Sequence, residues 1–160
     1  MPYRTGVPHF GPNGTPEKLN ESVLPNLRQT LGTVWERGSK RWQIVKIVDA
    51  ANAAIGDIVY WKNQETYTVT PTIANGSQSE VAGVMEVIAG AANNIVAVRQ
   101  GGLMSVKSAD ATLNARGFGI TSDVASNQAI KLAGVVASIG VTRAAQAAGF
   151  VSAFLNIQPV

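Results

Sequence analysis

Turn-forming residues divide the chain after Arg41 into short segments, and this limits the folds that it can adopt. Most of the segments are rich in valine, isoleucine, threonine and aromatic residues, which favour strands. Short strands separated by turns at intervals of roughly 8–12 residues are typical of an all-β barrel or sandwich. The sequence therefore predicts strands at 42–48, 58–61, 66–70, 81–88, 94–100, 103–107, 118–121, 129–132, 134–142 and 150–157.

The connections between these strands carry characteristic turn residues. We expect turns at 55–57 and 62–65, and a strong turn signal at Asn75-Gly76. The alanine clusters at 89–92 and 144–148 could each form one helical turn, but strands flank them, so we interpret them as small-residue corners. Gly101-Gly102 predicts a bulge or a positive φ angle. We also expect the carboxylates of Asp57 and Asp110 to accept hydrogen bonds from nearby backbone amides in turns.

The first 40 residues differ from the rest in their proline content. Five of the seven prolines lie within the first 25 residues, where they remove backbone donors and fix φ. Residues 1–16 are therefore expected to be extended. Leu24, Leu27 and Leu31 have helical spacing, but Pro25 limits this stretch to a short turn or helix. We predict an extended, Pro/Gly-rich basic N-terminal arm at 1–40 and a β-rich domain at 41–160.

Positive charge is concentrated toward the N-terminus. Residues 1–46 hold seven of the thirteen Lys and Arg residues and three of the ten acids, which gives +4, while the remaining residues sum to −1. A basic segment on a nearly neutral body indicates attachment to an acidic partner. Nucleic acid and an acidic protein surface are both candidates, and an ordinary solvated segment is the alternative.

Residue types that commonly carry catalysis are scarce. The chain has no cysteine, which excludes disulfides, thiolate metal sites and a cysteine nucleophile, and its single histidine, His9, excludes multi-histidine metal sites. The glycine pairs do not continue into a phosphate-binding loop, and the acids are widely spaced. We therefore predict no enzyme activity, no catalytic or metal-ligating residues and no cofactor. No apolar run is long enough for a membrane helix, and we expect neither a signal peptide nor a membrane partner.

Two parts of the β-rich domain have similar sequences. Residues 83–98 align with 140–154, and Gly56-Asp57-Ile58-Val59 aligns with Gly117-Phe118-Gly119-Ile120. In each case a short strand is followed by a small-residue corner and an alternating strand. The pattern predicts an internal strand-corner-strand repeat, whose alternative is coincidence in a chain rich in alanine, glycine and valine.

The phrases Gly56-Asp57-Ile58-Val59-Tyr60-Trp61, 81–85 and 94–102, with a second version at 139–151, resemble the capsid cement or decoration proteins of tailed bacteriophages. The resemblance covers about residues 55–157. It implies a β-rich fold, attachment to the outside of an icosahedral head, and no catalysis. It also implies the major capsid protein and copies of the chain itself, as a homotrimer, as partners. The expected location is the capsid exterior of the virion, after assembly in the host cytoplasm.

We therefore expect a structural protein that grips a larger protein surface. Trp35 lies beside the basic cluster, and tryptophan and arginine are enriched among residues that dominate binding energy, whereas Trp42 and Trp61 are expected in the core. The capsid-interface candidates are Tyr3, Arg4, Phe10, Leu24, Leu27, Arg28, Trp35, Arg37, Lys40 and Arg41. The alternatives are a nucleic-acid-binding module that uses residues 28–46, a head-fibre base or tail subunit, and a small hydrolase of unrecognised type.

Overall fold

The computed structural model describes residues 31–48, 53–72, 80–86, 95–123, 126–133 and 138–158. Within these ranges the predicted all-β class is confirmed, since every regular element is a strand. No helix in this part of the chain is long and apolar enough to cross a membrane. The strands are β1 (Val34–Arg37), β2 (Lys40–Ile47), β3 (Ile58–Asn63), β4 (Thr68–Thr70), β5 (Val81–Met85), β6 (Ile95–Lys107), β7 (Gly119–Ser122), β8 (Ala129–Lys131), β9 (Gly140–Thr142) and β10 (Phe150–Asn156).

A closed barrel of five strands forms one half of the molecule. Its order is β2-β4-β3-β5-β6, and a second set of hydrogen bonds between β6 and β2 closes the ring. All the pairings in the ring are antiparallel except that between β2 and β4, which is parallel. Closure removes the exposed edges that would otherwise be available for pairing with another chain.

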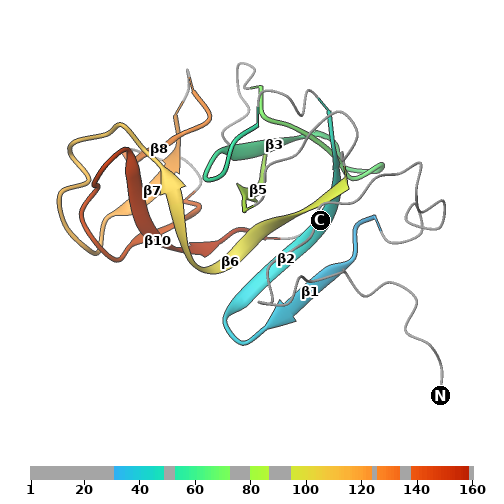
Figure 1. Cartoon of the computed structure of the whole chain (residues 1–160), viewed down its shortest axis with the longest axis horizontal. Coiled ribbons are helices and arrows are strands. Elements are labelled where there is room, and N and C mark those ends of the chain that lie inside the picture. Colours follow the sequence, from blue (N-terminus) through green and yellow to red (C-terminus); the bar gives the residue numbers. More distant parts are fainter. Residues whose placement is uncertain are drawn as a thin grey trace.

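The other half is a sheet that grows from the same long strand. Beyond the barrel, β6 continues and pairs with β10, and the order then runs through β9 and β7 to β8 (Figure 1). The two strands predicted at 94–100 and 103–107 are therefore one strand, bent at Gly101-Gly102. The predicted positive φ is found at Gly102, where it is +83°. A Cβ there would lie 2.6 Å from the Ser39 carbonyl oxygen, so glycine is required for the close approach as well.

The predicted internal repeat is present in the strand order. From the centre outward, one side runs β6-β5-β3-β4 and the other runs β10-β9-β7-β8. Each side is therefore built from strands of the same relative order, joined through the pairing of β6 with β10 (Figure 1).

The strand register confirms the repeat where β5 pairs with β3 and where β9 pairs with β7. At β6 and β10 the sequence alignment is out of step, because it ends on Val98 and Phe154, whereas Met85 pairs with Val98 and Thr142 pairs with Ala153. Val59 pairs with Gly83 in the first unit, and Ile120 pairs with Gly140 in the second. These are the positions that the sequence alignment matches. At both glycines an added Cβ would lie less than 3.0 Å from the facing strand. The same close packing of a glycine against the neighbouring strand therefore occurs in both units.

The core fills both halves of the molecule. One apolar cluster lies within the barrel, and a second joins β3 and β5 to β6, β7 and β10. Trp42 and Trp61 are 1% and 6% exposed, which confirms their expected place in the core. The hydroxyl of buried Tyr60 on β3 bonds the Ser122 hydroxyl on β7, and burial raises the pKa of Tyr60 to about 12. This bond links corresponding strands of the two units.

The predicted boundary between arm and domain falls inside a hairpin. β1 pairs with β2 in a register that places the backbone of Trp35 opposite Trp42 and that of Arg37 opposite Lys40. Residues 34–40 therefore belong to the sheet, because a proline-free stretch with β-forming residues can pair with the strand that follows it. Residues 144–148 form turns and a bridge instead of a helical turn, as interpreted from the sequence. The expectations for residues 1–30, 75–76, 89–92 and 134–137 lie outside the described residues.

Candidate functional site

The interface candidates divide into two groups. Four of them lie on the hairpin formed by β1 and β2, namely Trp35, Arg37, Lys40 and Arg41. The other six lie outside the described residues, namely Tyr3, Arg4, Phe10, Leu24, Leu27 and Arg28. The structure thus brings the second half of the predicted basic segment onto one element.

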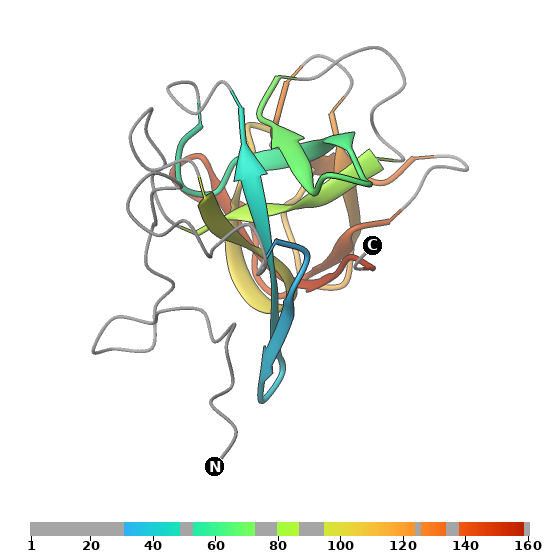
Figure 2. The same cartoon turned by 90° about the vertical axis from the view of Figure 1, so that its right-hand side faces the viewer.

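This hairpin presents cations at its tip. Arg37 and Lys40 face each other across the two-residue turn Gly38-Ser39, and both side chains are exposed. Gly38 has a φ of +60°, which is the conformation that such short hairpin turns require. Figure 2 shows the tip of the hairpin at the lower edge of the strands, below the barrel. Residues 34–47 hold four cations and one acid, Glu36, so the element is basic.

Arg41 has a contact inside the fold. Its Cβ lies 3.1 Å from the position that a Cβ on Gly101 would occupy, and its guanidinium donates a hydrogen bond to the carbonyl oxygen of Ile157. The half-buried side chain thus crosses β6 where glycine leaves room and contacts the end of β10. Arg41, one residue beyond the tip pair, therefore connects the hairpin to the second half of the molecule.

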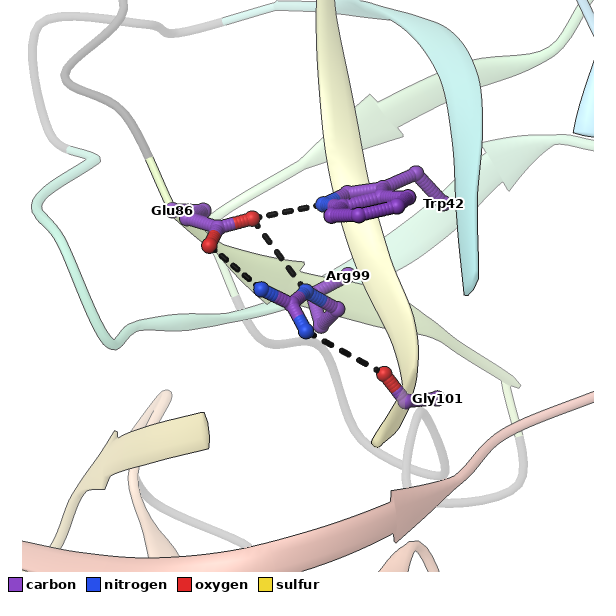
Figure 3. Close-up of polar contacts among 4 residues, drawn as sticks. All are labelled: Trp42, Glu86, Arg99 and Gly101. Atoms are coloured by element: carbon purple, nitrogen blue, oxygen red, sulfur yellow. Dashed lines mark hydrogen bonds and ion pairs between the residues drawn. The ribbon is translucent and has the colours of Figure 1, made fainter. Parts of the chain in front are cut away.

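A polar cluster in the barrel wall escaped the sequence analysis. The Glu86 carboxylate accepts bonds from the Trp42 indole nitrogen at 2.6 Å and from Arg99 Nη2 and Nε at 2.5 and 3.2 Å (Figure 3). The guanidinium carbon of Arg99 lies 4.5 Å from the centroid of the Trp42 ring. Arg99 is 2% exposed and Glu86 is 21% exposed. The cluster joins β2 and β6 to Glu86, the residue that follows β5, and its members lie too far apart in sequence to be recognised together.

A row of exposed apolar side chains also escaped the sequence analysis. Leu103 on β6, Phe154 on β10 and Val141 on β9 occupy neighbouring positions across three strands. The sequence of residues 150–156 does contain a signal for this row. Alternation along a strand places Val151, Ala153 and Leu155 on the buried face and the residues between them on the outer face. Two of those outer residues are phenylalanines, Phe150 and Phe154, although a strand face exposed to solvent does not require aromatic side chains for folding.

The two predicted turn carboxylates bond backbone amides as expected. Asp57 Oδ2 accepts a hydrogen bond from the Ala54 amide at 2.7 Å. Asp110 accepts bonds from the amides of Lys131 and Thr112 at 2.8 and 2.9 Å, and also from the Thr112 hydroxyl at 2.6 Å. The bond from the Lys131 amide, followed by that from the Thr112 hydroxyl, lowers the pKa of Asp110 below its ordinary value of 3.8. Asp110 therefore connects the loop after β6 to β8.

Replacement of this carboxylate is expected to weaken the fold in a pH-dependent way. Asp110→Asn loses the charged acceptor, and because the loop is partly exposed the cost at pH 7 is about 1 kcal/mol. A lowered native pKa means that the stabilisation is fully present above the unfolded-state pKa and is lost as the pH falls through the native pKa. The difference in unfolding free energy between the two proteins should therefore shrink below a pH of about 4. Urea unfolding from pH 7 to pH 3 measures it.

The matched control for this prediction is Glu65→Gln. Glu65 is an exposed acid in the turn between β3 and β4. Its replacement should leave the urea midpoint nearly unchanged throughout the same pH range. An Asp110→Asn difference that stays constant from pH 7 to pH 3 would show that the carboxylate charge does not contribute.

Neither the chemistry of the described residues nor comparison with other proteins identifies an active site. Within the described ranges, no group of three or more His, Cys, Asp or Glu side chains is placed to hold a metal ion. Searches with the sequence found no matching family model and no matching curated protein. Among the described residues, the basic hairpin and the apolar row are two exposed features whose composition suits contact with another molecule.

Proposed function

We propose that the protein is a structural virion component, a decoration (cement) subunit that binds the outer surface of a tailed-phage head and stabilises the lattice of the major capsid protein. The proposal rests on the resemblance to cement proteins. The observation that carries it further is the register-level repeat. The phrases that resemble those proteins lie in β3, β5 and β6, and their second version covers β9 and the start of β10. β9 pairs with β7 in the register in which β5 pairs with β3.

The proposed mechanism is mechanical. Each copy contributes a closed, rigid barrel with an adjoining sheet, and exposed cations on the hairpin tip are available to an acidic shell. Modest contacts, repeated over many symmetric positions and shared among copies in a homotrimer, would add up along the shell. Attachment of this kind needs neither a cofactor nor a reacting group.

The proposal is tested on shells assembled without this protein. Heads of the phage that encodes the chain, produced from a genome in which its coding sequence is deleted, are mixed with the purified full-length chain. We expect saturable binding at a copy number set by the head symmetry and an increase in the temperature at which the shells disrupt. A chain that does not bind, or that binds without changing shell resistance, is not a cement subunit. A copy number of only a few per particle would instead indicate a head-fibre base or a tail subunit.

Binding to nucleic acid is the second candidate function, and the basic hairpin favours it. Arg37 and Lys40 project from a narrow two-stranded element, which is a shape that can approach a phosphate backbone. This function predicts an affinity for duplex DNA that falls steeply as the salt concentration rises. Absence of DNA binding at low salt would exclude it.

A further inference from the structure

We infer that the outer face of β6, β10 and β9 is the surface that contacts the partner, and that the partner is a protein surface with an apolar centre and an acidic rim. This inference rests on the proposed function and specifies which face of the subunit meets the shell. Phe154 pairs with Leu103 on one side and with Val141 on the other. Their exposed fractions are 37%, 53% and 44%. Because residues directly opposite in a sheet have Cβ atoms about 5 Å apart, the three side chains form a continuous apolar row.

Exposed apolar side chains are concentrated on this face. Within the described ranges, six large apolar residues are exposed, and four of them lie on these three strands: the three of the row and Phe150, four residues before Phe154 on β10. Single exposed apolar residues are ordinary on a protein surface, whereas neighbouring ones on one face mark an interaction site. The distribution therefore points to a surface that is covered when the protein functions.

The surroundings of the row are basic. Segments 101–107, 140–143 and 150–156 contain Lys107 and Arg143 but no acid. The guanidinium carbon of Arg143 lies 5.5 Å from the centroid of the Phe154 ring. Lys107 is paired with Asp57 at 2.8 Å, so Arg143 is the cation of this face that we assign to the partner.

The hairpin tip supplies cations at the opposite end of the row. The backbone at Ser39 and Lys40 packs against Gly102, the residue immediately before Leu103. The hairpin tip, which carries the exposed cations Arg37 and Lys40, therefore adjoins β6 next to Leu103, whereas Arg143 lies at the end of the row formed by Val141. An apolar strip between cations is complementary to an apolar strip between acids, because interfaces combine an apolar centre with a polar rim of matched charge.

Charge also argues against two occupants from the chain itself. A second copy placed face to face would bring the same cations together. The N-terminal segment 1–16 contains Arg4 and no acid, so it is basic as well. Because juxtaposed like charges weaken association, an acidic surface of a different protein is the occupant that the face favours.

The test measures the binding of full-length variants to shells that lack the protein. Leu103→Gln removes the most exposed apolar side chain of the row, and Arg143→Glu and Lys40→Glu reverse the charge at its two ends. We expect each variant to bind at least about tenfold more weakly than the wild-type chain at moderate salt. Lys62→Glu, which makes the same charge change at an exposed lysine near the end of β3, is the matched control and should bind within about twofold of wild type. Far-UV circular dichroism confirms folding, and Val141→Thr replaces Leu103→Gln if the latter fails to fold.

The outcomes separate this inference from the proposed function. If the wild-type chain binds shells and the face variants bind equally well, the inference is overturned and the proposed function stands. If the wild-type chain does not bind, both are overturned. A wild-type dimer that Leu103→Gln dissociates would identify a second copy as the occupant, and DNA binding lost in Arg143→Glu would identify nucleic acid. Either result would overturn the inference.

Discussion

Replacement of Gly140 by alanine is expected to lower the free energy of unfolding by about 3 kcal/mol or more. The new Cβ would lie 2.5 Å from the carbonyl oxygen of Phe154 and 3.2 Å from the Cα of Leu155. Both atoms belong to the backbone of β10, so neither can move without separating β9 from β10. Urea unfolding followed by circular dichroism measures the loss.

Two further variants make this prediction specific. Gly119→Ala is the control on the neighbouring strand, because its nearest contact is the flexible Leu132 side chain at 3.1 Å; its cost should stay below about 1 kcal/mol. Gly83→Ala tests the repeat, since its Cβ would lie 2.9 Å from the carbonyl oxygen of Arg99. It should destabilise in the same direction as Gly140→Ala. Equal stability of the Gly140 and Gly119 variants would contradict the proposed close packing of the two strands.

Arg99→Met is expected to be the most damaging single change in the barrel wall. The substitution keeps an unbranched apolar stem but leaves the Glu86 carboxylate without its cationic partner. Removal of one member of a buried ion pair costs about 3 kcal/mol when the remaining charge is largely desolvated. The lower end of the usual range applies because Glu86 keeps 21% exposure. Thermal and urea unfolding both measure the change.

The companion variant for this prediction is the double change Glu86→Gln/Arg99→Met. The double variant removes the unpaired carboxylate charge and keeps an amide oxygen that can accept the hydrogen bond from the Trp42 indole. It should therefore recover part of the stability lost in Arg99→Met. Lys62→Met, at an exposed cation, should shift stability by less than about 0.5 kcal/mol. An Arg99→Met protein as stable as the wild type would show that the ion pair contributes no net stabilisation.

Most strands were predictable because local chemistry selects them. Val59 and Tyr60, for example, belong to a β-branched and aromatic run between turn signals, and no long-range information is needed to place them in a strand. The repeat was predictable for the same reason, since its glycines recur at matching positions. The single strand at 95–107 was not, because Gly101-Gly102 is compatible with either a bend or a break. Pairing with β2 before the glycines and with β10 from Gly101 onward makes it one strand.

The candidate site was less predictable than the fold. The basic residues were identified from their spacing, but only strand pairing shows that Arg37 and Lys40 project from the hairpin tip while Arg41 crosses to Ile157. Likewise, Glu86 and Arg99 are 13 residues apart in the sequence, and nothing in this spacing indicates that they form an ion pair whose carboxylate also accepts a hydrogen bond from Trp42.

By itself, the sequence determined that the chain is divided into short strands, where many of the turns occur, and that one β-unit occurs twice, because these properties depend on each residue's own backbone preferences. Tertiary structure alone decided that β2 closes the barrel against β6 and that the faces of β9 and β10 remain open on one side. Alternation along a strand specifies which residues share a face. Which face is then covered depends on segments far away in the chain. The face that carries Leu103, Phe154 and Val141 is not covered by any of the described segments.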